Sequence, residues 1–548
     1  MSEVWAAFAV ALVPWAALTW LRLKLFLHIL QLEEYFTRPF LRWLAANPGR
    51  YLPSQTTAVI PTAGLAALLL LFDLAAGGAI VVLAVWGAIG AVALYLTLRT
   101  TRVARKPLVM TTRARRLLVA ASLVCLAIVG LAALVAGLQF AYREGVAAGM
   151  IATVAVRALA GHVLAVANLL LYPVEEALRR KFQAQAKHKL REQHPKVIAI
   201  TGSAGKTTTK ELVAQLLSAR YRVLKTPSSF NTPMGIARTV NDSLARQDYF
   251  VVEMGAYRKG EIEKLCRLVG GADISVITTV NAQHLERFGS LEKTAEAKFE
   301  IVEGLKHGGT AVLNYDVPAV RERARSQNGL RVISFGLDPS NNPDVLGTNV
   351  VERPDGIELD VSFDGRTVPV KTQLLARHNA GNVLAAFGVG VACGLDLSYM
   401  AAAVRQLRSP EHRLQAVKLA NGVIELDDAY NANPEGIVGA LEVLGSYKGR
   451  RRIVVTPGLV EMGREKAPYH ARIGQVAAKT CDMAVLVGPK QTADIRASML
   501  QAAFPPERIH VVKGVDEARQ LLGREGSSED VILFANDLPD QYDEELAI

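Results

Sequence analysis

Cysteine is scarce in this sequence, and its four cysteines are widely separated. Cys125, Cys266, Cys393 and Cys481 form no Cys-x-x-Cys pair. This spacing argues against a disulfide framework or a zinc site, and it fits a reducing compartment. The sequence also lacks a zinc-finger spacing and an RNP-like segment, so the net charge of +11 gives little support to nucleic-acid binding.

Charge is almost missing from long stretches of the first 172 residues, although 21% of the whole chain is charged. A helix needs roughly 20 mostly apolar residues to cross a membrane. We therefore predict an α-helical transmembrane domain over residues 1–175, with about five spans. A cleavable signal peptide is not expected, because the first run lacks a basic n-region and more runs follow. The predicted spans are Val4–Trp20, Thr57–Phe72, Leu74–Leu98, Leu117–Phe140 and Val146–Tyr172.

Basic residues cluster between alternate spans and again after the last one, in a predicted juxtamembrane linker at residues 176–192. The opposite turns carry only Asp73, Arg143 and Glu144. Because Lys and Arg favour the cytoplasmic side, we predict a multi-pass protein of the cytoplasmic (inner) membrane. Its N-terminus would lie outside and its C-terminal half in the cytoplasm. Four or six spans are alternatives, since residues 50–99 can be divided differently, and an even number would move the N-terminus.

Arg157 lies inside the fifth predicted span. An arginine within a membrane is costly and often functional, for example by pairing with a lipid phosphate. Alternatively, the helix tilts or starts later, so that the side chain reaches an interface or lines the helix bundle. Both interpretations are open at the level of the sequence.

A phosphate-binding loop is predicted soon after the basic segment. Residues 196–201, KVIAIT, predict a short buried strand, and a helical pattern runs from Lys210 to Ala219. Between them lies GSAGKTTT, the shorter GxxGK[ST] form of the loop. Backbone N–H groups and the helix N-terminus would cradle phosphates, the lysine would reach the outer phosphates, and a threonine would bind Mg²⁺. The loop residues assigned to ATP are Gly202, Ser203, Ala204, Gly205, Lys206, Thr207 and Thr208.

A series of short segments follows along the chain: TGSAGKTTTKE (201–211), SFNTPMG (229–235), VEMG (252–255), GEI (260–262), HLE (284–286), FGS (288–290), AKFE (297–300), NYD (314–316), HN (378–379), NVLAA (382–386), Arg413 and DDAYNANP (427–434). In these segments and their order, the chain resembles the Mur ligase family over residues 196–463. DDAYNANP is the most specific segment and points to the branch that adds D-alanyl-D-alanine.

The resemblance implies an ADP-forming ligase that uses ATP to activate a carboxylate as an acyl phosphate and then couples it to an amine. It implies that Lys206 contacts the outer phosphates. It also implies that Thr207 and Glu253 hold one Mg²⁺ and that His284 helps to hold a second. Lys298 matches the family's carbamylated lysine. The remaining residues that the resemblance implicates are Asn314, Asn382 and Arg413 for the nucleotide, with Arg413 also catalytic, and Asp428, Tyr430, Asn431 and Asn433 for the substrate.

Past residue 196, short β-rich runs alternate with helical patterns, which is typical of parallel sheets with helices on both faces. The predicted fold class is an α-helical transmembrane domain followed by α/β domains. A P-loop central Mur ligase domain is predicted at 193–411, and a C-terminal Rossmann-like Mur ligase domain at 412–548. Leu407–Pro410 is the predicted hinge, and closure there would keep water from an acyl phosphate.

Three departures from the family concern the substrates. The membrane domain stands where the branch has a small soluble domain that binds the UDP part of its substrate. TPGLVEMG (456–463) lacks an aspartate of the family's GDM-ELG segment, and FANDLP (534–539) replaces a KGSR-like segment. The last two lie in the domain that selects the amine. The reaction class therefore transfers better than the identity of the substrates.

The predicted function is ATP-dependent amide-bond formation on a cell-envelope precursor that is related to peptidoglycan and is either UDP-linked or lipid-linked. The expected partners are ATP, two Mg²⁺ ions, an amino acid or dipeptide, a muropeptide-like acceptor and membrane lipid. The alternatives are a polymer ligase of the poly-γ-glutamate type and a non-catalytic membrane scaffold that binds nucleotide. DDAYNANP argues against the polymer ligase. The retained phosphate-loop and ligand residues argue against the scaffold.

Overall fold

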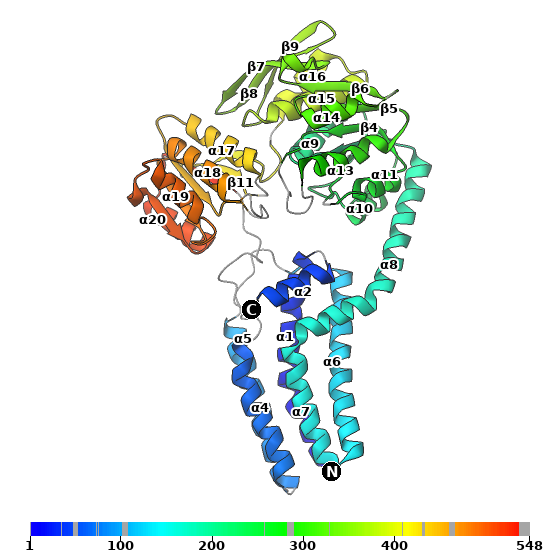
Figure 1. Cartoon of the computed structure of the whole chain (residues 1–548), viewed down its shortest axis with the longest axis vertical. Coiled ribbons are helices and arrows are strands. Elements are labelled where there is room, and N and C mark those ends of the chain that lie inside the picture. Colours follow the sequence, from blue (N-terminus) through cyan, green and yellow to red (C-terminus); the bar gives the residue numbers. More distant parts are fainter. Residues whose placement is uncertain are drawn as a thin grey trace. The chain divides into compact units, whose positions relative to one another are not determined.

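The computed structural model describes two compact units, of which the first ends at Leu178 and the second begins at Arg179. Figure 1 shows helices alone in the first unit, and sheets covered by helices in the second. The described residues are 2–33, 35–47, 53–72, 74, 76–100, 108–256, 258–281, 290–327, 329–407, 409–429, 433–459 and 466–535.

The first unit is a bundle of helices, and each of the five predicted apolar runs falls on them. Within the described ranges, α1, α5 and α6 are long and apolar enough to cross a membrane, and the bent pair α7–α8 adds a fourth crossing if it is one span. Five spans therefore stay a prediction. The helices are α1 (Ser2–Leu32), α2 (Thr37–Ala46), α4 (Pro53–Leu71), α5 (Ala76–Thr100), α6 (Thr112–Gln139), α7 (Tyr142–Ala158) and α8 (Ala160–Gln193).

Small residues allow α1 and α5 to pack closely. A Cβ added to Gly87 would lie 3.1 Å from Cα of Ala11, and one added to Gly90 would lie 2.6 Å from Nε1 of Trp15. Such residues let helix backbones approach each other where burial of apolar surface gives little drive for association. Trp15 also stacks on Trp86 with ring centroids 5.4 Å apart, and its Nε1 donates to the Trp86 carbonyl at 3.1 Å. Helices α1 and α5 are therefore closely packed around a pair of stacked tryptophan rings.

The fifth predicted span is not one straight helix. α7 and α8 meet at Leu159 with a bend of 80°. Beyond the bend, a Cβ on Gly161 would lie 3.0 Å from the Leu44 side chain, and Asn168 Nδ2 donates to the Tyr35 carbonyl at 3.1 Å. These contacts hold α8 against α2 and against the segment that joins α1 to α2, so the chain turns instead of continuing along α7.

Residues 176–192, which we predicted as a basic linker, are helical and form the second part of α8. Within the second unit, this part of α8 is fastened to α10 (Pro233–Ser243). Lys189 Nζ donates to the Asn241 carbonyl at 2.9 Å, and Asn241 Nδ2 donates to the Phe182 carbonyl at 3.0 Å. From Arg179 onward, the segment is therefore a packed helix of the second unit.

A nine-stranded sheet forms the central domain of the second unit, in the order β2-β3-β1-β4-β5-β6-β7-β8-β9. The strands from β2 to β7 pair in parallel, whereas β8 pairs antiparallel with β7 and β9. The antiparallel strands, labelled at one end of the domain in Figure 1, go beyond the parallel sheet that we predicted. The strands are β1 (Lys196–Thr201), β2 (Val223–Lys225), β3 (Tyr249–Glu253), β4 (Ala272–Ile277), β5 (Leu305–Asn314), β6 (Arg331–Gly336), β7 (Val345–Arg353), β8 (Gly356–Phe363) and β9 (Arg366–Thr372).

Helices cover both faces of this sheet, because side chains alternate along each strand. In β1, Ile198 and Ile200 join the core that includes α9 and α15, while Val197 and Ala199 join the core that includes α10, α11, α13 and α14. The helices are α9 (Lys206–Ser218), α11 (Glu261–Val269), α13 (Leu291–Glu303), α14 (Pro318–Arg325), α15 (Asn379–Ala392) and α16 (Leu397–Ala403).

The strand order reverses at β1, which pairs with β3 on one side and β4 on the other. In open parallel sheets, ligands bind outside the carboxyl ends of the strands at such a reversal. The predicted phosphate loop follows β1, and Glu253 ends β3. The topology therefore brings these two predicted features to one edge of the sheet.

The C-terminal domain has a six-stranded sheet in the order β10-β11-β15-β12-β13-β14. All pairs are parallel except β10 with β11, and the sheet separates one core that includes α17, α18 and α19 from another that includes α20. This confirms the predicted second α/β domain. The elements are β10 (Gln415–Lys418), β11 (Ile424–Asp428), α17 (Pro434–Ser446), β12 (Arg451–Thr456), α18 (Lys466–Thr480), β13 (Met483–Val487), α19 (Ala493–Gln501), β14 (Ile509–Val512), α20 (Val515–Glu525) and β15 (Asp530–Ala535).

Candidate functional site

The loop between β1 and α9 depends on two glycines. Gly202 has a φ of 153° and Gly205 a φ of 79°, a region that residues with a Cβ rarely adopt. A Cβ at Gly205 would collide with Oδ1 of Asn382, and one at Gly202 would collide with Oγ1 of Thr278. Thr278 Oγ1 also donates to the Ala204 carbonyl at 2.5 Å. The loop is therefore held in shape from the β4 side and from α15.

Lys206 is the first residue of α9, and its side chain folds back over the loop. Nζ donates to the Gly202 and Ser203 carbonyls at 2.9 and 3.0 Å. Desolvation lowers the pKa of this ammonium; the charge of Arg413 adds to the effect and that of Glu253 opposes it. A cation beside a helix N-terminus attracts phosphate. Phosphate oxygens could replace the two carbonyls as acceptors for Lys206.

Glu253 is the acid of this edge of the sheet, and it is only 1% exposed. Its Oε2 accepts from Thr207 Oγ1 at 2.9 Å, and its Oε1 accepts from Asn231 Nδ2 at 3.1 Å. A carboxylate and a hydroxyl beside a phosphate loop are the oxygen donors that Mg²⁺ takes together with substrate phosphates, so the residues fit this ion. Two of the three predicted metal ligands are thus in contact, and the third, His284, lies outside the described residues. Within the described ranges, no group of three His, Cys, Asp or Glu side chains forms a metal site.

Lys210 is a buried cation that the sequence analysis did not assign to the site. Its side chain is 0% exposed, its Nζ donates to the Ser228 carbonyl, and it lies 3.5 Å from Oε2 of Glu253. Burial lowers the pKa of its ammonium, and Glu253 opposes that shift. The signal that could have identified it is its position four residues after Lys206, which places both lysines on one side of α9.

Lys298 lies on α13 and is 3% exposed, although the helix pattern alone would make it a solvated charge. Nζ donates to the Ala256 carbonyl at 3.3 Å. Burial and, to a smaller extent, the positive charge of Lys206 lower the pKa of this lysine to about 7, while the charges of Glu261 and Glu300 act to raise it. With such a pKa, the neutral amine form of Lys298 is accessible near neutral pH.

Asn382 and Asn314 both bond to the protein's own polar groups around the loop. Asn382 Oδ1 accepts from Thr209 Oγ1 at 3.3 Å, and its Nδ2 donates to Asn379 Oδ1 at 2.7 Å. Asn314 Nδ2, at the end of β5, donates to the Thr278 carbonyl at 2.7 Å. The structure thus puts Asn382 against the phosphate loop and links Asn314 to that loop through Thr278, and their predicted contacts with the nucleotide stay predictions.

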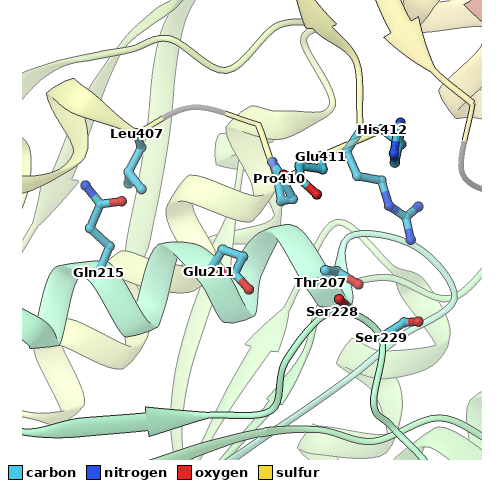
Figure 2. A pocket seen from close by; sticks show the side chains of 10 residues that line it. Thr207, Glu211, Gln215, Ser228, Ser229, Leu407, Pro410, Glu411 and His412 are labelled. Atoms are coloured by element: carbon cyan, nitrogen blue, oxygen red, sulfur yellow. The ribbon is translucent and has the colours of Figure 1, made fainter.

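A cavity of about 310 Å³ opens beside the start of α9. Figure 2 shows Thr207 at the start of that helix, with Glu211 and Gln215 further along it. The segment that leads into the C-terminal domain lines another side. Arg413, which we predicted to approach the phosphates, lines this cavity and is close enough to Lys206 for their charges to repel. The lining residues are Thr207, Glu211, Gln215, Ser228, Ser229, Leu407, Pro410, Glu411, His412 and Arg413.

Asp428 is the last residue of β11, in the C-terminal domain. Burial raises the pKa of its carboxyl to about 7; Asp427 adds to this shift and Arg413 opposes it. Asp428 is therefore electrostatically coupled to Arg413. Tyr430 and Asn431, the next two predicted substrate residues, lie outside the described residues.

The first turn of α17 supplies a link between the two domains. Asn433 Oδ1 accepts from the Gly436 N–H at 2.9 Å, so this predicted substrate residue caps the helix. Glu435 Oε2 accepts from Asn281 Nδ2 at 2.9 Å, which joins the central domain to the C-terminal domain. The sequence analysis missed Asn281 and Glu435. The available signal was their position beside the HLE and DDAYNANP segments.

Comparison with known proteins gives a consistent result. The Mur ligase middle domain matches residues 200–390, and the Mur ligase glutamate ligase domain matches residues 412–536. UDP-N-acetylmuramoyl-tripeptide--D-alanyl-D-alanine ligase of Escherichia coli (strain K12) is 33% identical over 311 residues, which are 56% of this chain and 68% of that protein. The Bacillus subtilis (strain 168) enzyme of the same name is 30% identical over 353 residues, 64% of this chain and 75% of that protein.

Solved structures share the fold of the second unit's domains. A crystal structure of MurF from Acinetobacter baumannii matches with a TM-score of 0.58 and 23% identity, over 66% of this chain and 78% of that one. MurF ligase from Thermotoga maritima, in complex with ADP, matches with a TM-score of 0.58 and 24% identity, over 67% and 82%. The phosphate loop, the Thr207–Glu253 pair and these matches lead to one conclusion. The chain belongs to the Mur ligase family of ATP-dependent ligases.

Proposed function

We propose that this Mur ligase joins a D-alanyl-D-alanine-like amine to a lipid-linked peptidoglycan precursor at the cytoplasmic face of a membrane. The observation that carries the proposal is the contact of Thr207 with Glu253 beside Lys206, at the strand reversal of the central sheet. The identity of 33% to a UDP-N-acetylmuramoyl-tripeptide--D-alanyl-D-alanine ligase supports the choice of amine. The apolar helices of the first unit support a membrane-bound acceptor.

In the first chemical step, an oxygen of the acceptor carboxylate forms a bond to the γ-phosphorus of ATP as the bond to the ADP oxygen breaks. Lys206 and the N–H groups at the start of α9 would hold the phosphates in line for this transfer. Mg²⁺, when held by Thr207 and Glu253, supplies a Lewis acid that neutralises phosphoryl charge. Arg413 lines the adjoining cavity and would add a further positive charge when the domains close.

In the second step, the amine forms a bond to the carbonyl carbon and phosphate leaves with the bonding electron pair. The amine must lose a proton, and we propose that Asp428 lies at its binding site. A carboxyl with a pKa of about 7 can accept a proton near neutral pH. In this proposal, Asp428 positions the amine at its binding site. Tyr430, Asn431 and Asn433 belong to the same motif and complete the proposed amine site.

We also propose that Lys298 is carbamylated. Its neutral amine would form a bond to the carbon of CO₂ and release a proton, which leaves a negatively charged carbamate. The low exposure of Lys298 and its pKa of about 7 support this, because only the neutral amine is nucleophilic. The carbamate would face the charge of Lys206 and, with His284, would help to hold a second Mg²⁺. Asn314 and Asn382 are the proposed contacts on the nucleoside side.

The experiment is phosphate release by the full-length protein in detergent with ATP and Mg²⁺. Each amine, with D-alanyl-D-alanine first, is paired with the same muropeptide attached either to UDP or to a polyprenyl diphosphate. We expect release that needs the amine and is much faster with the lipid-linked acceptor than with the UDP-linked one, and the Lys206→Ala variant is the inactive control. Equal turnover of the UDP-linked acceptor would contradict the lipid preference. Absence of release with every pair would contradict the proposed substrates.

A further inference from the structure

Buried donors lie inside the first unit where an apolar helix bundle should have none. Arg157, near the end of α7, is 7% exposed, and its Nε and Nη1 have no hydrogen-bond partner among the residues that the structure describes. Trp86 on α5 is 0% exposed, and its Nε1 likewise has no partner within the described part of the chain. A donor without an acceptor is costly in a protein interior, and more so where the surroundings are hydrocarbon.

A second arginine increases the positive charge at this place. Arg22 on α1 is 6% exposed, and it is close enough to Arg157 for the two charges to repel. Both guanidinium groups lie near aromatic rings: Arg157 is 5.9 Å from the centre of the Trp15 ring, and Arg22 is 5.2 Å from that of Phe26. Ring faces offset only part of the cost of a buried cation. An anion bound at Arg157 would offset this repulsion and accept from Nε and Nη1 of its guanidinium.

We propose that Arg157, with Arg22, forms an anion site between α1 and α7 that binds the phosphate group of a lipid. A phosphate has several acceptor oxygens and at least one negative charge, so it can satisfy Nε and Nη1 of one guanidinium together. The acyl or prenyl chains of such a ligand would lie along the apolar outer surface of the helices. Basic pockets between membrane helices commonly bind lipid head groups in this way.

This inference rests on the membrane placement in the proposed function, but it does not rest on ligase chemistry. It names a place where a phosphate-bearing lipid is held by the first unit. The acceptor of the ligase is one lipid of this kind, and a structural phospholipid is another. Both share the phosphate that the arginines recognise.

The test is lipid binding to the full-length protein in detergent, measured by native mass spectrometry without ATP or any acceptor. Dioleoyl phosphatidic acid is the probe, dioleoylglycerol is the matched lipid without phosphate, and inorganic phosphate is the matched anion without chains. We expect phosphatidic acid to bind at least about tenfold more tightly than dioleoylglycerol, because charge-assisted hydrogen bonds are lost with the phosphate. Inorganic phosphate that competes fully for the site would identify the source as a free phosphate.

The Arg157→Gln variant should lose the preference for phosphatidic acid over dioleoylglycerol. Arg157→Lys should keep part of it, because lysine retains the charge but cannot form the bidentate hydrogen bonds of a guanidinium. Arg99→Gln, which removes an equal charge from an exposed position on α5, is the matched control and should bind as the unaltered chain does. Undiminished preference in Arg157→Gln would overturn the site. If that variant does not fold, equal binding of phosphatidic acid and dioleoylglycerol to the unaltered protein would overturn it as well. Failure of the ligase assay affects none of these readouts.

Discussion

The ammonium of Lys210 and a magnesium ion would compete for the same carboxylate. Lys210 Nζ lies 3.5 Å from Oε2 of Glu253, which is the oxygen that also accepts from Thr207. We therefore regard Lys210 as a positioning residue that holds Glu253 while no metal is bound. Because its side chain is fully buried, its removal should affect both metal affinity and folding, in opposite directions.

For Lys210→Met, we expect Mg²⁺ to bind about tenfold more tightly, because a nearby positive charge is gone. The free energy of unfolding should fall by about 3 kcal/mol, because Glu253 is left buried without its cation. Magnesium titration followed by calorimetry and urea unfolding give the two quantities. Lys210→Arg, which keeps the charge, is the control. A variant that loses stability but keeps the original magnesium affinity would show that Lys210 is only structural.

Lys298 offers a second prediction at the scale of one residue. Lys298→Ala should lower kcat by roughly 10²–10³, as loss of one group that stabilises developing charge does. Short carboxylic acids such as acetate should restore part of the activity, since they can occupy the space of the carbamate. The buried surroundings of Lys298 leave such a space when the side chain is truncated. Activity that does not respond to added acids would contradict the carbamate.

At the scale of elements, α18 holds the segment that follows β12 through one histidine. His470 is 0% exposed, and the Leu459 N–H donates to its Nε2 at 2.9 Å. Burial lowers the pKa of His470 to about 4, and Lys466 adds to the shift. The unfolded chain therefore binds a proton more readily than the folded one between pH 4 and about 6.5, and stability falls as the pH falls through this window.

We expect the stability of the C-terminal domain to fall by about 2 kcal/mol from His470 alone between pH 7 and pH 5. Urea unfolding of the protein at the two pH values measures the change. Other groups titrate in the same range, so the quantity of interest is the difference from His470→Gln, which keeps an acceptor but does not titrate. If the free energy of unfolding depends on pH equally in the unaltered protein and in His470→Gln, His470 is not the source of that dependence.

The elements also show what sequence patterns can and cannot predict. β1 and β3 were predictable because almost every residue in them is buried, so that KVIAIT and YFVVE read as apolar runs. β7 has only two fully buried residues, near its start, and its remaining side chains are more exposed, so its sequence carries no such run. The bend between α7 and α8 depends on contacts of Gly161 and Asn168 with residues more than a hundred positions away.

Some residues of the candidate site could likewise be predicted from the sequence, and others could not. The phosphate loop and Glu253 could be predicted, because a glycine turn between strand and helix and an acid at a strand end are local features. The burial of Lys210 and Lys298 could not, because a lysine on a helix is exposed by default and only the packing of other elements covers it. The Asn281–Glu435 contact joins residues from two domains, and no local pattern specifies it.

At the scale of the whole molecule, we expect the first unit to deliver the acceptor and the second unit to carry out the reaction, and truncation can test this. The second unit has its own hydrophobic cores and contains every described residue of the proposed ligase site. We expect a fragment of residues 179–548 to fold and to keep ATP-dependent turnover of a water-soluble muropeptide acceptor. Its kcat/KM for the same acceptor anchored in lipid vesicles should fall by about 100-fold, because a shared membrane raises the effective concentration of the two partners.

Phosphate release by the full chain and by the fragment, with both acceptors, gives the comparison, and Lys206→Ala in the fragment controls for contaminating ATPases. If the fragment turns over the vesicle-bound acceptor as fast as the full chain, membrane attachment has no part in substrate delivery. If the fragment folds but is inactive on both acceptors, residues of the first unit must contribute directly to the acceptor site. The expected loss, confined to the anchored acceptor, would assign delivery to the first unit and chemistry to the second.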